Sequence, residues 1–177
     1  MNLATAQAIS AEVIEQLKPF CTFISVAGST RRKCEEIGDI EIVLLRRGKD
    51  LIQFAEIVNS WKKVKGDVYG RYTQRYYTYK GYDYILDIFM PTPEDHIRQF
   101  VIRTGSDNYS HHTIATAWVK KGYRGTKDGL RLANECSVKN KIYQCNVPNP
   151  TLPPEFQTEQ EFFDWLGVPF VEPEKRI

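Results

Sequence analysis

The sequence predicts an α+β fold: a mixed sheet with two helices, followed by a smaller lobe of helices and short β elements. Three observations predict it. Apolar, β-branched strand patterns alternate with amphipathic helical patterns up to residue 91. A tyrosine-rich stretch, residues 71–91, has the alternation of a β-hairpin with its turn at Lys80-Gly81. After Pro91 the hydrophobic pattern becomes helical, which places the lobe boundary between residues 93 and 94.

The first lobe, residues 1–93, is expected to combine two helices with the strands of one sheet. The apolar residues of each helix recur on one face, so both helices are expected to cover the same side of the sheet. The expected elements before the hairpin are a helix over 5–18, a strand over 23–26, a helical turn over 31–36, a strand over 40–45 and a helix over 49–59.

The second lobe, residues 94–177, is expected to be mainly helical. Two helices are expected over 94–105 and 108–122, the second with Gly122 as its C-cap. Residues 133–157 are expected to be a loop, because prolines gather near their end. A last helix follows Thr158, which with Glu161 has the spacing of a capping box.

Composition bounds the function without identifying it. A net charge of +2 gives no strong preference for nucleic acid, and the lysine clusters at 62–65, 120–127 and 139–141 fit either a solvated face or a nucleic-acid surface. The four cysteines form no CxxC motif and the three histidines lack zinc-site spacing, which indicates reduced thiols. The expected location is the cytoplasm, or the host cytoplasm for a viral or phage protein. No membrane segment is expected, because no run approaches about 18 apolar residues.

Two carboxylates one residue apart, Asp39 and Glu41, stand at the head of an apolar strand. Side chains alternate along a strand, so both point to one face while Ile40 points to the core. Asp87 lies on the second arm of the hairpin, and if that arm is the neighbouring strand, three carboxylates meet. Magnesium or manganese would relieve their repulsion, and two such ions support phosphoryl transfer. The ordinary alternative is a surface strand with alternating charge.

A Gly28-Ser29 turn lies shortly before these carboxylates and is followed by Arg31 and Arg32. Backbone N–H groups and a small hydroxyl in such a turn can hold a phosphate, and an arginine can pair with it through two hydrogen bonds. The alternatives are that Ser29 only shapes the turn and that Arg32 only faces solvent.

At these residues the chain resembles the family X DNA polymerases, the group that includes DNA polymerase beta. The palm of that family carries Gly-Ser and a double arginine, then Gly-Asp-x-Asp. Here the pattern reads Gly28-Ser29-Thr30-Arg31-Arg32 and Gly38-Asp39-Ile40-Glu41, with Glu41 where most members have Asp. The third carboxylate of the family lies in a strand before a proline, which corresponds to Leu86-Asp87-Ile88 and Pro91.

The second half resembles the thumb of the same family in three motifs. They are RTGSD at 103–107, AWVKKGYRGTKDGL at 117–130 and FDWLGVPFVEPEKR at 163–176. The resemblance runs from about residue 5 to the end and starts at the first palm helix. It therefore implies the minimal palm-and-thumb form, with a catalytic palm over 1–93, a thumb for the nascent base pair over 94–177, and no lyase domain.

The resemblance implies a role for each matched residue. Asp39, Glu41 and Asp87 would be catalytic and hold two Mg²⁺ ions, with Mn²⁺ as an alternative, and Asp87 would also orient the primer 3′-hydroxyl. Gly105-Ser106 matches an element that contains a cis peptide bond. Ile102-Arg103 replaces an aromatic pair that helps exclude ribonucleotides, so rNTP is an alternative substrate to dNTP. The implied nucleotide-binding residues are Gly28, Ser29, Arg32, Gly38, Gly105, Ser106, Asp107 and Ser110.

The tyrosine-rich hairpin is the expected contact with DNA, through arginines on phosphates and rings stacked on bases. Its alternative is ordinary packing, since tyrosine is a good strand residue. The expected DNA-binding residues are Arg71, Thr73, Arg75, Lys120 and Lys121.

Three functional hypotheses follow. The first is a monomeric, gap-filling repair DNA polymerase that acts on primer-template or gapped DNA. The second is a template-independent nucleotidyltransferase that acts on single-stranded nucleic acid or another acceptor. The third, a non-catalytic nucleic-acid-binding module, is disfavoured by the presence of all three carboxylates.

Overall fold

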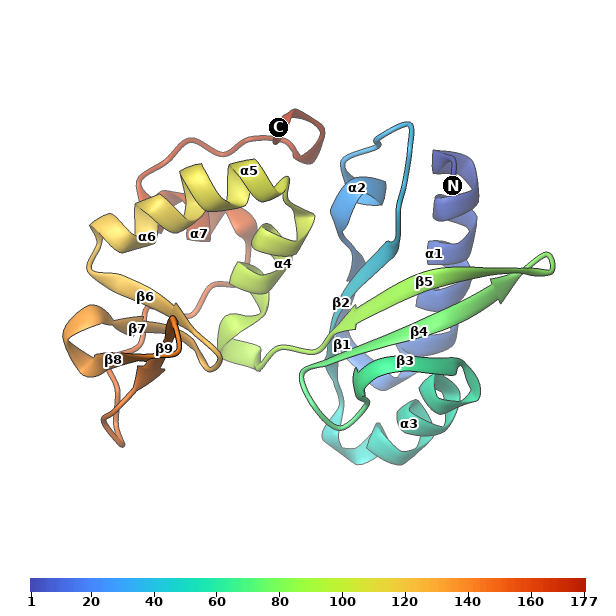
Figure 1. Ribbon diagram of the computed structural model, residues 1–177, viewed down its shortest axis with the longest axis horizontal. Coiled ribbons are helices and arrows are strands. Elements are labelled where there is room, and N and C mark those ends of the chain that lie inside the picture. The colour runs from blue at the N-terminus through green and yellow to red at the C-terminus, as the bar shows by residue number, and fades with distance from the viewer.

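The computed structural model describes residues 1–177 as two lobes with a cleft between them (Figure 1). The first lobe is α+β, as the sequence predicts. Its elements are α1 Leu3–Leu17, β1 Cys21–Val26, α2 Gly28–Arg31, β2 Ile40–Arg46, α3 Leu51–Ser60, β3 Lys62–Asp67, β4 Tyr72–Tyr79 and β5 Tyr82–Phe89.

These strands form one mixed sheet in the order β1-β2-β5-β4-β3. Strands β2 and β5 are parallel neighbours, and every other pairing is antiparallel. The expected hairpin is confirmed: β4 and β5 join through Lys80 and Gly81, whose φ angles of 49° and 83° fit a type I′ turn. The edge strand β3 was not predicted, because all of its residues are exposed and it has no apolar alternation.

The two helices expected on one side of the sheet are found there. Ile9, Val13 and Leu17 of α1 and Phe54 and Val58 of α3 are fully buried in one core with the inward residues of β2 and β5. The opposite face of β2 and β5 is turned toward the second lobe, as Figure 1 shows. One face of the sheet therefore carries the core and the other is available for a site.

The second lobe has its own core, built from its helices and the aromatic residues around Phe156, Phe162 and Phe163. Its helices are α4 His96–Thr104, α5 Asp107–Tyr109, a π-helical stretch Ser110–Ala115, α6 Thr116–Lys120 and α7 Glu159–Leu166. Its strands form two hairpins, β6 Tyr123–Thr126 with β7 Gly129–Leu132 and β8 Cys136–Lys139 with β9 Ile142–Cys145. No helix in either lobe has the length and apolar character needed to cross a membrane.

Two sequence-based expectations are corrected. Residues 133–157 are not one loop, because they contain the β8–β9 hairpin; its strands are four residues long and mostly exposed, so they show no apolar alternation. The helical turn expected over 31–36 begins earlier, as α2 over Gly28–Arg31. Half of the capping box is confirmed: Thr158 Oγ1 accepts from Glu161 N at 3.2 Å, but the Glu161 carboxylate accepts from Gln157 N and not from Thr158 N.

Candidate active site between the lobes

Three carboxylates from two adjacent strands face the cleft between the lobes. Glu41 on β2 lies directly opposite Asp87 on β5, and Asp39 immediately precedes β2. Ile40 and Ile42 point to the other side and are fully buried. Asp39, Glu41 and Asp87 all line the cleft, whose volume is about 1410 Å³. The parallel pairing of β2 with β5 brings Asp87 beside Glu41, which lies 46 residues earlier in the sequence (87 − 41 = 46).

In this group, burial and mutual repulsion outweigh the nearby positive charges. Burial and the charge of Asp39 raise the pKa of Glu41 to about 7, although Arg103 opposes the rise. Burial and the neighbouring Asp87 also raise the pKa of Asp39. Partial burial and neighbouring negative charges make ionisation of a carboxyl group less favourable. A bound cation would make ionisation favourable again.

Two side chains of β4 hold Asp87 in place. The hydroxyl of Tyr72 donates to Asp87 Oδ1 at 2.5 Å, and Gln74 Nε2 donates to the same oxygen at 2.8 Å. Burial and the bond to Asp87 raise the pKa of Tyr72, so its hydroxyl stays a donor. Neither residue was predicted as part of the site. The one sequence feature that could have indicated them is the alternate spacing of polar residues along the tyrosine-rich strand.

The expectation that Thr73 and Arg75 contact DNA is corrected. Thr73 is 0% and Arg75 is 2% exposed, because both point to the buried side of β4. Arg75 Nη2 donates to Asn59 Oδ1 on α3 at 2.9 Å, and Thr73 Oγ1 donates to the backbone oxygen of Lys65. The face of β4 that reaches the cleft is instead the one with Tyr72 and Gln74.

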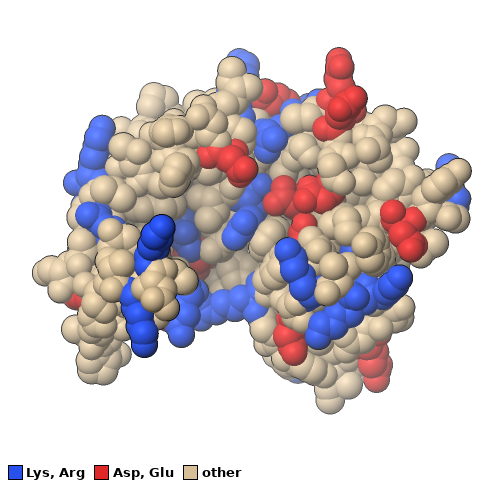
Figure 2. Space-filling model, viewed as in Figure 1, with Lys and Arg blue, Asp and Glu red and all other residues tan.

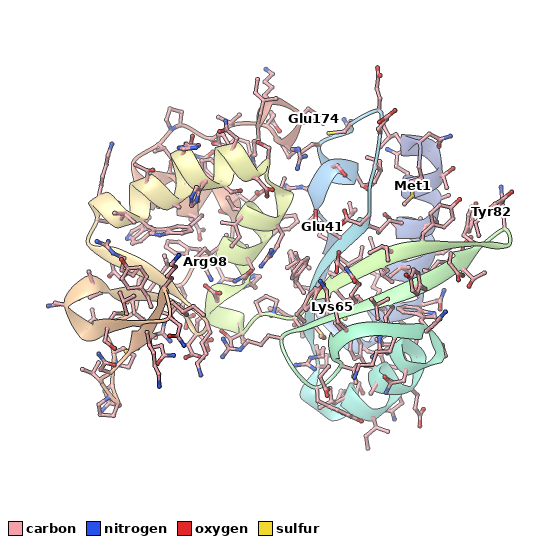
Figure 3. All side chains as sticks on the ribbon, viewed as in Figure 1. Met1, Glu41, Lys65, Tyr82, Arg98 and Glu174 are labelled. Atoms are coloured by element: carbon pink, nitrogen blue, oxygen red, sulfur yellow. The ribbon has the colours of Figure 1, made fainter.

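Arg103 is a cation that the second lobe brings close to the carboxylates. It comes from α4, and its guanidinium lies 4.1 Å from the centre of the Phe89 ring. Its Nε is buried without a hydrogen-bond partner, and burial lowers the pKa of the guanidinium while Glu41 opposes that. Figure 3 shows Glu41 on the sheet wall of the cleft and Arg98, also from α4, on the opposite wall.

The Gly28 position allows Glu41 to lie against the start of α2. Gly28 has φ +61°, and a Cβ there would lie 1.9 Å from Glu41 Oε2, so a side chain would be strained and would displace the Glu41 carboxylate. No three His, Cys, Asp or Glu side chains are grouped closely enough in this structure to hold a metal ion.

The arginines that follow the Gly28-Ser29 turn reach into the second lobe. Arg32 Nη1 donates to the backbone oxygen of Thr104 at 2.5 Å, and Arg31 Nη1 donates to Thr104 Oγ1 at 2.7 Å. Gly105 has φ +74°, which side chains rarely adopt, and a Cβ there would also displace Arg32 Nη1. Arg32 was expected to bind phosphate, but in this structure its guanidinium joins the first lobe to Thr104 of the second lobe. Ser29 lies beside it, half-buried on α2.

A buried ion triad completes the contact between α2 and the second lobe. Arg31 pairs with Glu159 of α7 through two bonds, 2.5 Å and 3.0 Å, and Arg176 Nη1 binds Glu159 Oε1 at 2.9 Å. Burial would raise the pKa of Glu159, but the bonds and charges of Arg31 and Arg176 outweigh it and hold the pKa below its usual range. The Glu159 carboxylate is therefore paired with two arginines, while Arg176 Nη2 is buried without a hydrogen-bond partner.

The matched residues of the second lobe lie at the end of α4 and along α5. The Gly105–Ser106 peptide bond is cis, as the resemblance implies. Asp107 and Ser110 line the cleft, and the Ser110 hydroxyl donates to the Ile102 backbone oxygen at 3.0 Å. On the other wall, Gly38 is exposed directly before Asp39.

Lysine and arginine side chains gather around the cleft (Figure 2). Arg71 reaches across it, donating to the backbone oxygen of Lys127 and pairing with Asp128 at 3.2 Å. Lys120 and Lys121 are exposed on and just after α6, outside the cleft lining. Their contact with DNA stays a prediction. The cations that line the cleft are Lys65, Arg71, Arg98, Arg103 and Lys127.

Comparisons with known proteins agree with this architecture. A family model described as the DNA polymerase beta thumb matches residues 100–177. Among solved structures, the chain is similar to polymerase beta of Leishmania infantum in a ternary P/T complex, with 18% identity, a TM-score of 0.73, and coverage of 100% of this chain and 76% of that one. A ternary gap complex of the same polymerase matches with 17% identity, a TM-score of 0.73, and coverage of 99% and 70%.

A comparison with curated protein sequences gave no match. The family model covers the second lobe, and the solved structures extend the likeness over both lobes. The names palm for residues 1–93 and thumb for residues 94–177 follow this likeness in fold. The second lobe is therefore similar to a DNA polymerase beta thumb, and the two lobes together have the fold of polymerase beta.

Proposed function

We propose that the protein is a DNA polymerase that adds dNMP to a primer 3′-hydroxyl by phosphoryl transfer with two metal ions. One observation carries the proposal: three carboxylates on adjacent parallel strands face a large cleft that a polymerase beta-like thumb closes from the other side. Burying like charges together costs stability, and such clusters are a mark of functional sites.

The residues present fit a pair of magnesium ions. Carboxylate oxygens are the hard ligands that Mg²⁺ and Mn²⁺ prefer. The raised pKa values of Asp39 and Glu41 support this fit, because added positive charge would favour their ionised forms. When bound, the ions would polarise the transferred phosphoryl group and neutralise its developing charge.

The chain's own residues would position the reactants. Asp87 is held by Tyr72 and Gln74, so its second oxygen is the one free to orient the 3′-hydroxyl and accept its proton. Ser29 and Arg32 lie on α2 beside the carboxylates, where a triphosphate would need partners. Arg32 would exchange its bond to Thr104 for one to phosphate.

DNA is the proposed macromolecular partner. The structures that the chain resembles are described as primer-template and gap complexes of their own protein, and the cleft here is wide and rimmed by lysine and arginine. Phosphate contacts from such residues hold a duplex in register. Repair of short gaps by a monomer in the cytoplasm, including a host cytoplasm, is the setting we propose for this activity.

The test is extension of a labelled primer with Mg²⁺ and all four dNTPs on a one-nucleotide gap, an open template and the primer alone. The proposal predicts addition of the complementary base, strongest at the gap. Addition to the primer alone would instead identify a template-independent nucleotidyltransferase. No addition on any substrate, with Mn²⁺ and rNTPs also supplied, would exclude nucleotidyl transfer to nucleic acid.

A further inference from the structure

Two cysteines of the thumb, Cys136 and Cys145, face each other across the open end of the β8–β9 hairpin. Cys136 opens β8, Cys145 closes β9, and the two are direct partners in the strand register. Both are free thiols and half-buried. Neither lines the cleft or contacts the carboxylates, so the proposed polymerase site makes no use of them.

The register decides how close the two side chains are. Asn140 and Lys141 form a two-residue turn, so the flanking pair Lys139 and Ile142 is hydrogen-bonded and the type of pair alternates outward from it. The Asn146 N–H donates to the Glu135 carbonyl at 2.9 Å, which marks the next hydrogen-bonded pair. Cys136 and Cys145 therefore form a non-hydrogen-bonded pair.

This kind of pair has the spacing that a disulfide needs. Cα atoms of non-hydrogen-bonded partners lie about 4.5 Å apart, and their side chains are on the same face of the ladder. Disulfides join Cα atoms about 4.4 to 6.8 Å apart. Burial and the adjacent Cys145 thiol raise the pKa of Cys136, which shows that the two sulfur groups sense each other. The other cysteines, Cys21 and Cys34, belong to the palm, so each thumb thiol has one intramolecular partner within reach.

We propose that Cys136 and Cys145 are a reversible thiol–disulfide site that closes the β8–β9 hairpin. The oxidant is a small-molecule disulfide of the glutathione class. One cysteine thiolate attacks a sulfur of that disulfide, and the S–S bond breaks to release one small thiol. The second cysteine thiolate then attacks the protein sulfur of the mixed disulfide and releases the second small thiol. The two cysteines are oxidised, the small disulfide is reduced to two thiols, and those thiols take up the two protons.

The bond would steady a segment that supports one wall of the cleft. The hairpin has only two short strands, and Val138 and Ile142 at its tip are 60% and 56% exposed, so its own packing is weak. It attaches to β6 through Tyr143, whose ring lies 5.6 Å from the Arg124 guanidinium. The turn after β6 lines the cleft.

Oxidation of the folded protein with oxidised glutathione tests the proposal. Remaining thiols are then alkylated, and tryptic peptides are analysed by mass spectrometry with and without reduction. We expect a crosslinked pair of peptides containing Cys136 and Cys145, lighter by two hydrogens, that reduction separates. Trypsin cuts after Lys139 and Lys141 should leave the two fragments joined until a reductant is added.

Matched variants locate the bond. Cys136→Ser and Cys145→Ser should each abolish the crosslink, and Cys34→Ser should leave it unchanged; circular dichroism checks that each variant is folded. Separate glutathione adducts on Cys136 and Cys145, full alkylation of both after oxidation, or a bond from either one to Cys34 would overturn the proposal. These readouts do not depend on polymerase activity.

Discussion

Two regions of the molecule bury carboxylates, and they do so in opposite ways. In the cleft, Glu41 lies among other acidic groups, and its pKa rises to about 7. At the contact between the lobes, Glu159 is held between Arg31 and Arg176, and its pKa falls below the usual range although burial alone would raise it. Both kinds of site remove charge from water, but only the second supplies the compensating charge from the chain itself.

The difference separates a site from a structural joint. A buried carboxylate with two arginine partners is complete and stabilises the arrangement of the lobes that it joins. A group of like charges with incomplete pairing makes the fold less stable and is typical of a site that binds a ligand. The two regions meet at α2, where Gly28 contacts Glu41 and Arg31 contacts Glu159.

The largest effect is expected from Asp87→Asn. The amide keeps an oxygen that can accept from Tyr72 and Gln74, but it loses the charge needed for metal and proton transfer. Primer extension should fall by about a thousandfold, the scale of losing an acid–base group, with no loss of melting temperature. Asp83→Asn on the same strand is the control, because Asp83 is exposed and bonds only Thr78. Extension near the wild-type rate by Asp87→Asn would remove Asp87 from the mechanism.

Glu159→Gln should break the paired region instead. It leaves Arg31 and the fully buried Arg176 without their shared counter-charge. The free energy of unfolding should fall by about 3 kcal/mol, as when one partner of a buried ion pair is removed. Urea denaturation measures the change. Glu174→Gln, which affects the exposed pair Lys33–Glu174, should show no measurable loss, and equal losses in both variants would contradict the distinction.

Magnesium should stabilise the cleft region selectively. Thermal melts of the wild type with saturating Mg²⁺ are expected to rise by about 3 °C or more over melts in EDTA, because a ligand that binds only the folded state shifts the midpoint. The rise should be lost in Asp39→Asn and kept in Glu159→Gln. An equal rise in Asp39→Asn would place the ion somewhere else.

The smallest effect is the acid dependence of Glu159. Because the pKa of Glu159 is depressed in the folded protein, its contribution to stability is complete above its ordinary pKa of 4.5 and is lost as pH falls below that value. As the pH falls below 4.5, the free energy of unfolding of the wild type should therefore decline more steeply than that of Glu159→Gln. Urea titrations at a series of pH values measure both slopes, and parallel slopes would show that Glu159 is not the titrating group.

Local pattern by itself determined where two of the three cleft carboxylates point. The Asp39-x-Glu41 spacing places both carboxylates on one face of β2 whatever the strand's neighbours are, because side chains alternate. The Lys80-Gly81 turn and the Thr158 cap follow in the same way from short-range chemistry. Local pattern did not determine the parallel pairing of β2 with β5, which brings Asp87 beside Glu41 as the third carboxylate.

Tertiary structure decided what local alternation leaves ambiguous. Strand β4 has Tyr72 and Tyr76 on one face and Tyr77 and Tyr79 on the other. Its sequence therefore does not say which face is buried, and the prediction that Arg75 is exposed was wrong. The partners of Arg31 and Arg32 depend on α7 and on the end of α4, which are distant in sequence. A side chain's type sets what it can bind, but only the packing of the lobes determines which partner reaches it, because long-range contacts leave no local pattern.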